Sequence, residues 1–143
     1  MQMHDRLAKT IEKFETGLKD CRQPEDRTLV LSYLANLAPI LARAVLGSDV
    51  LKELPEVERM FGNSWLHDSQ PFENAFAEWR LFRREYEERS FSAMTVNERL
   101  SAASIMGEFD QACTAKDRTT ARRLLQSVYL GEADIEAILL DRM

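Results

Sequence analysis

The stretch Leu29–Leu46, LVLSYLANLAPILARAVL, decides the fold class. A helix drawn through it is apolar on nearly every side, and the interruptions are Ser32, Asn36, Pro39 and Arg43. Such a helix lies either in the centre of a core or in a membrane. The stretch is long enough to span a bilayer, but an arginine near a membrane centre costs about 2.5–3.5 kcal/mol. We therefore expect the central helix of a soluble bundle, over residues 24–46, and no membrane partner.

Proline 39 interrupts the pattern of this helix near its middle. Because proline removes one backbone hydrogen bond and clashes with the preceding turn, we expect a kink at Pro39.

The flanking segments show helical periodicity as well. In the first of them, residues 4–21, one face carries Leu7, Ile11, Phe14, Leu18 and Cys21. Caps, glycines and prolines delimit five further helices, at about 49–61, 71–89, 95–115, 118–129 and 132–142. No segment alternates with the period of a strand. The expected fold is all-α, a single-domain bundle (residues 1–143) of six or seven helices around the central, Pro-kinked helix.

Composition narrows the classes of function. The 143 residues are 45% hydrophobic and 30% charged, which is typical of one globular domain. The net charge of −5 provides no general affinity for nucleic acid. Cys21 and Cys113 are far apart in sequence and form no zinc motif with a histidine. The charged segment Met1–Glu15 lacks the apolar core of a signal peptide, so we expect a cytoplasmic protein.

Motifs that carry catalysis are missing from the sequence. His67, Asp68 and Ser69 are the residue types of a hydrolase triad, but adjacent residues do not form that relay. HExxH, GxSxG and phosphate-binding glycine loops do not occur. We therefore expect no catalytic residue, no metal site and no cofactor, and the chain is more typical of a non-enzyme.

An aromatic-rich region begins at Trp65. Seven of the twelve aromatic residues lie between Trp65 and Phe91, and most of them fit one buried stripe. Trp65 and His67 fall in the expected loop at 63–70, and the helix that follows carries Arg80, Arg83 and Arg84. Since tryptophan and arginine dominate protein–protein hot spots, these five residues form a candidate partner-binding surface. The alternative is that Trp65 folds inward as a lid on the core.

A basic patch precedes the last helix and consists of Lys116, Arg118, Arg122 and Arg123. With the helix that follows it, the patch has the outline of a helix-turn-helix. That second helix, however, carries Glu132, Asp134, Glu136 and Asp141, which would face phosphates unfavourably. We expect the patch to be solvated or paired with acidic residues, and we do not expect nucleic acid as a partner.

Three hypotheses on function follow. The first is a protein-binding module, such as an inhibitor, an immunity-type protein or an adaptor, whose partner is another protein; a homodimer is left open. The second is a DNA-associated regulator that uses the basic patch. The third is a small-molecule binder or enzyme with a pocket beside the kinked helix.

Overall fold

The computed structural model describes residues 2–143, and these are about 80% helical without a strand. The expectation of an all-α protein is confirmed, with eight α-helices in the described residues rather than six or seven. The chain divides into two compact units, residues 1–86 (unit 1) and residues 87–143 (unit 2). Their boundary falls within one helix, and the single domain expected from the sequence stays a prediction.

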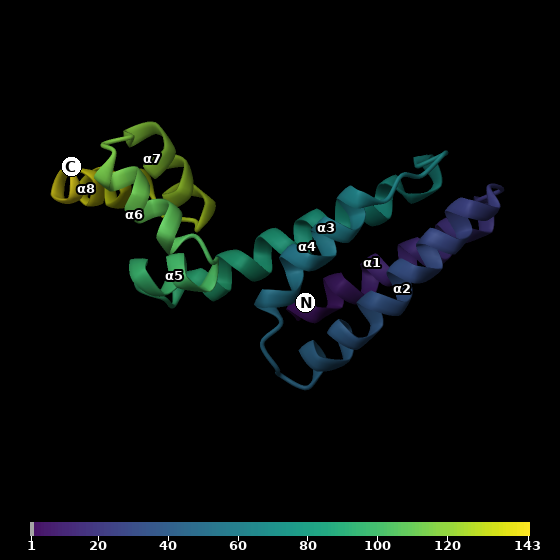
Figure 1. Ribbon diagram of the computed structural model, residues 1–143. Coiled ribbons are helices and arrows are strands. Elements are labelled where there is room, and N and C mark those ends of the chain that lie inside the picture. Colours follow the sequence, from purple (N-terminus) through teal and green to yellow (C-terminus); the bar gives the residue numbers. More distant parts are fainter. Residues whose placement is uncertain (1) are drawn as a thin grey trace. The chain divides into compact units, whose positions relative to one another are not determined.

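Unit 1 contains the helical elements α1 (Met3–Asp20), α2 (Pro24–Val45), the 3₁₀ turn η1 (Leu51–Glu53), α3 (Leu54–Asn63), the 3₁₀ turn η2 (Gln70–Phe72) and most of α4 (Glu73–Ser92). α1 and α2 pack side by side as a hairpin (Figure 1). The core between the elements is rich in aromatic rings. Phe14 of α1 lies at its centre, with the rings of Tyr33, Phe61, Phe72 and Phe76 all within 6.2 Å of its own centroid.

Gly17 permits the closest approach between α1 and the segment that leads into α4. A Cβ atom at this position would lie 2.5 Å from the carbonyl oxygen of Pro71 and 2.6 Å from the ring of Phe72. Any side chain here would force the backbone apart, because real Cβ atoms do not approach so closely. The buried line of α1 therefore runs through Gly17, and the expected member Leu18 is only partly buried.

The prediction that α2 is a central, enclosed helix is wrong. Its buried face carries Asp26, Val30, Tyr33, Leu37 and Ile40, while much of the opposite face is exposed. α2 is the one helix of the described residues that is long and apolar enough to cross a membrane, and 22% of its most apolar window is buried. The helix continues through Pro39 to Val45, so the kink stays a prediction.

Unit 2 holds the end of α4 and four short helices, α5 (Val96–Ala102), α6 (Met106–Thr114), α7 (Arg118–Ser127) and α8 (Glu132–Arg142). Along the chain, α5 packs on α6, α6 on α7 and α7 on α8. The sequence predicts one helix over 95–115 where the structure has two. Ser104, at φ 59°, ends α5 in the left-handed region, and the N–H of Ile105 donates to the carbonyl of Leu100. Arg99 binds the carbonyls of Val128 and Tyr129 and so ties α5 to the end of α7.

Candidate functional site

The segment between α3 and η2, residues 64–69, matches the loop expected at 63–70 and carries Trp65 and His67. We call it the tryptophan loop. Asp26, in the first turn of α2, is fully buried and binds the backbone of this loop. Its two carboxylate oxygens accept the backbone N–H groups of His67 (2.8 Å) and Asp68 (2.9 Å). Both oxygens are therefore engaged in fixing two consecutive residues of the loop.

Further hydrogen bonds fix the two ends of the tryptophan loop. The hydroxyl of Ser64 donates to the carbonyl of Met60 in α3 at 2.6 Å. At the other end, the carboxylate of Asp68 accepts the N–H of Gln70, which starts η2. Ser64 also contacts the phenol of Tyr33, whose pKa is raised by burial and lowered in part by this hydrogen bond. The loop backbone is thus tied to α2, α3 and η2.

The side chain of Trp65 points outward from this anchored backbone. It is 83% exposed, and the ring of the exposed His67 lies 6.0 Å away at an interplanar angle of 37°. The alternative in which Trp65 folds inward as a lid is therefore wrong. The aromatic core is formed instead by other rings, among them Phe14, Phe61, Phe76 and Trp79, which contact one another.

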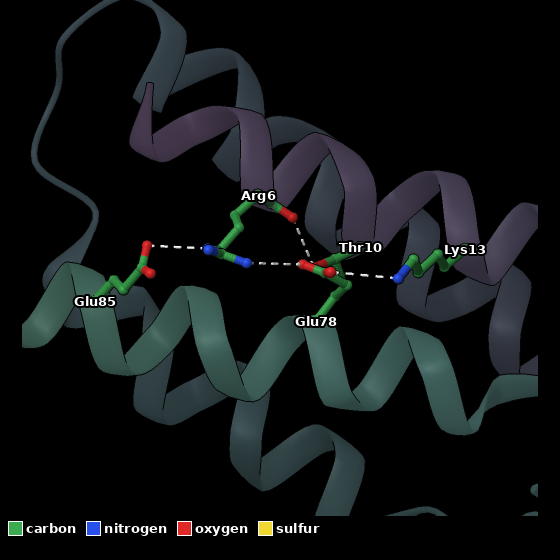
Figure 2. A network of polar contacts seen from close by, with 5 residues as sticks. All are labelled: Arg6, Thr10, Lys13, Glu78 and Glu85. Carbon is green, nitrogen blue, oxygen red and sulfur yellow. Dashed lines mark hydrogen bonds and ion pairs between the residues drawn. The ribbon is translucent and has the colours of Figure 1, made fainter. Parts of the chain in front are cut away.

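An ion network holds α4 against α1, and the sequence analysis did not predict it (Figure 2). Arg6 of α1 binds Glu85 at 3.0 Å and Glu78 at 3.6 Å, and Lys13 binds Glu78 at 3.2 Å. The hydrogen bond to Glu85 is the main reason why the pKa of Arg6 is raised. The hydroxyl of Thr10, which is fully buried between these cations, donates to the carbonyl of Arg6. α4 is thereby fixed along two turns by charged contacts.

The three arginines of α4 that belong to the predicted partner-binding surface have different environments. Arg80 and Arg84 are exposed, one helical turn apart on the same side. Arg83 lies within 3.5 Å of Glu58, the carboxylate that also accepts the indole N–H of the buried Trp79. Arg80 lies about 10 Å along the helix axis from the start of α4. Five residues were expected to form the partner-binding surface. Of these, Trp65 and His67 lie together in the structure, and Arg83 contacts Glu58 of α3.

The basic patch of unit 2 faces carboxylates of the same unit. Arg122 forms hydrogen bonds with Glu132 and Glu136 of α8, and Arg118 lies 3.8 Å from Glu136. Lys116 precedes the helix in the left-handed region, and Asp117 caps α7 by accepting the N–H of Thr120. Two of the four cations predicted for the patch are thus balanced by the acidic residues that the sequence analysis considered unfavourable for DNA.

Three carboxyl groups of unit 2 have a pKa below the ordinary value. Hydrogen bonds from Arg122 lower the pKa of Glu136, those from Thr120 lower that of Asp117, and those from Thr95 lower that of Glu98. A group with a lowered folded-state pKa stabilises the fold above its unfolded pKa, and the stabilisation is lost as pH falls.

We therefore expect unit 2 to lose stability as the pH drops from about 5 to about 3. The measurement is amide hydrogen exchange in α7 and α8 across this range. The variant Glu136→Gln should show a shallower loss than the wild type, because its side chain no longer titrates. Equal slopes for the two proteins would show that the pair Arg122–Glu136 contributes nothing.

Two cavities bear on the small-molecule alternative. One of about 290 Å³ lies beside Pro39, between α2 and α3, and is lined by Asn36, Ile40, Val57 and Met60 among others. Its charged edge includes Arg43 and Glu53, which bind each other at 2.6 Å. The other, of about 340 Å³, lies within unit 2 against Leu100, Phe109 and Ile138. Among residues 2–143, no group of three or more His, Cys, Asp or Glu side chains is placed to hold a metal ion.

Comparison of the chain with family models, with curated proteins and with solved structures gave no match.

Proposed function

We propose that the chain is a protein-binding module without catalytic activity of its own, and that its partner docks on the tryptophan loop. The observation that carries the proposal is the combination of an exposed Trp65 with an anchored backbone. Tryptophan contributes strongly to interfaces because it presents a large, rigid apolar surface. A loop that is already ordered loses little conformational entropy when a partner binds. An exposed tryptophan on an immobilised loop therefore combines a large contact area with a low cost of ordering.

Arg80, exposed on α4 about 10 Å along the helix axis from its start, suggests what else a partner could bind. A guanidinium binds carboxylates in two-pronged fashion, so a partner with an apolar pocket for Trp65 and acidic groups nearby would fit. The DNA-associated alternative has less support, since Arg118 and Arg122 contact carboxylates of α8. The two cavities described above are the observation in favour of a small-molecule role.

Trp65→Ala is the test of this proposal. Because the side chain is 83% exposed, we expect the free energy of unfolding to stay within about 0.5 kcal/mol of the wild type. The variant should nevertheless lose the partner that the wild-type chain captures from its native host. Fluorescence quenching gives a second readout. Because Trp79 is buried, a soluble quencher should reduce mainly the fluorescence of Trp65 in the free protein. A bound partner should protect Trp65 from the quencher.

Leu140→Ala is the matched control, since Leu140 of α8 is 81% exposed. This variant should capture the same partner as the wild type. Capture of that partner by Trp65→Ala at wild-type strength would contradict the proposal, and so would unfolding of the variant.

A further inference from the structure

The cavity beside Pro39, between α2 and α3, combines apolar residues that are buried with polar residues that are exposed. Ile40 of α2 and Val57 of α3 are 5% and 4% exposed, and the partly buried Met60 adds to this apolar part of the lining. Asn36 and Glu56 are exposed and form part of the rim. An apolar interior with a few polar groups at its edge is the usual make-up of a small-molecule site, and the volume of about 290 Å³ suits a small ligand.

Pro39 leaves a backbone acceptor without its donor at this cavity. In an α-helix the carbonyl of residue 35 accepts the N–H of residue 39, and proline has no N–H. Since α2 continues through Pro39, the carbonyl of Ala35 loses its helical donor, and both residues line the cavity. A carbonyl in this state takes its hydrogen bond from water or from a ligand that carries a donor.

The other polar groups of the rim are acceptors as well. The amide nitrogen of Asn36 donates to the carbonyl of Ser32 at 2.8 Å, so its amide oxygen is the group left to bind a ligand. Arg43 is the one cation among the described residues that line the cavity, and Glu53 binds it at 2.6 Å. Glu56 has no ion-pair partner among residues 2–143. The rim therefore offers acceptors and a net negative charge, while its cation is already paired.

We propose that this cavity binds a primary ammonium group carried on a short apolar chain. An ammonium has three N–H donors and no acceptor, which matches the carbonyl of Ala35, the amide oxygen of Asn36 and the carboxylate of Glu56. The apolar chain would pack on the buried part of the lining. An anion would be repelled by Glu56, and a neutral molecule would forgo the charge-assisted hydrogen bond. The proposal does not depend on the function proposed for the tryptophan loop.

Titration with n-pentylammonium tests the proposal on the wild-type chain. Amide resonances of residues 35–43 and 53–60 should shift saturably at constant ionic strength, with a dissociation constant of about 0.1–10 mM for so small a ligand. Pentanoate has a chain of the same length and the opposite charge, and pentan-1-ol is neutral. Both should bind at least fivefold more weakly than the ammonium ion.

Glu56→Gln removes the unpaired charge and should weaken binding of n-pentylammonium at least fivefold. Glu56 is exposed, so circular dichroism should show an unchanged helix content. The matched control is Glu15→Gln, which makes the same change at an exposed position of α1 outside the cavity. Glu15→Gln should bind the ammonium ion like the wild type.

Pro39→Ala tests the role of the carbonyl of Ala35. The variant restores an N–H that the carbonyl accepts within the helix, and it should raise the melting temperature because proline destabilises a helix interior. Binding of n-pentylammonium should nevertheless weaken at least threefold, since one acceptor is now occupied. A more stable protein with a weaker site is the result that a purely structural proline would not give.

Ala35→Leu should block the cavity, and Ala38→Leu is its control. Both alanines are exposed on α2, but only Ala35 lines the cavity. We expect Ala35→Leu to weaken binding at least tenfold and Ala38→Leu to leave it unchanged.

The ammonium group could come from a free amine or from a lysine side chain of another protein. Nα-acetyl-lysine methylamide distinguishes the two, because its backbone must stay outside the cavity. Binding as tight as that of n-pentylammonium would assign the site to a lysine side chain, and binding at least tenfold weaker would assign it to a free amine. The proposal is overturned if n-pentylammonium shows no saturable binding, if pentanoate or pentan-1-ol binds equally well, or if Glu56→Gln and Pro39→Ala both bind like the wild type.

Discussion

Asp26→Ala should lower the free energy of unfolding by about 2–4 kcal/mol. The reason is that the fully buried carboxylate accepts two backbone N–H groups, and each group left without its partner costs about 1–3 kcal/mol. Asp26 also lies in the first turn of α2, where a negative charge interacts favourably with the helix dipole. Urea unfolding followed by the fluorescence of the buried Trp79 would measure the loss.

Asp26→Asn provides the matched comparison. The amide keeps one acceptor oxygen, so about half of the loss should be recovered. The amides of His67 and Asp68 should exchange with solvent faster in Asp26→Ala than in the wild type, and partner capture should weaken although Trp65 is intact. A loss of stability below about 0.5 kcal/mol would mean that the carboxylate does not hold the tryptophan loop.

Phe14→Ala should destabilise unit 1 by about 3–5 kcal/mol, the usual range for deletion of a buried aromatic ring. Phe14 is fully buried, and four other rings pack around it at centroid distances of 5.2–6.2 Å. The cavity left behind would border several large side chains that are themselves fixed by their neighbours. Denaturant unfolding measures the change.

Phe14→Leu is the control for cavity size and should cost less, because it fills much of the same volume. Amide exchange should rise in α1, α2 and α4 up to Tyr86, and the helices α6 and α7 of unit 2 should keep their protection. Equal losses of protection in both units would show that they unfold as one.

Local patterns in the sequence predict the helices and the position of the tryptophan loop. Gly62-Asn63 and Pro71 punctuate the chain on either side of that loop, and such signals act over a few residues. The sequence pattern does not predict the break after α5. Ser104 adopts a left-handed conformation there, and glycine or asparagine usually occupies such a position. Local sequence gives no sign of it.

Features that depend on contacts between residues far apart in the sequence cannot be predicted from such local patterns. The burial of Asp26 depends on a loop that lies some forty positions further along the chain. The exposure of Trp65 depends on which other rings fill the core, and tryptophan is buried on average. Uniform apolarity predicted that α2 is enclosed, but it does not reveal how many sides of a helix the rest of the chain covers. The pairing of Arg122 with Glu132 and Glu136 follows from the packing of α7 on α8.

The close approach at Gly17 also has a consequence for the order of folding. Gly17 meets Pro71 and Phe72, so α1 completes its packing with a segment more than fifty residues away. Contacts in unit 2 are more local, since helices that follow one another pack together and the bond from Arg99 to Val128 spans about thirty residues. Closing a long loop costs entropy before its contacts form, and proteins rich in distant contacts fold more slowly. During synthesis, α1 and α2 would wait for the start of α4 before completing their packing, whereas unit 2 would form soon after α8 is made.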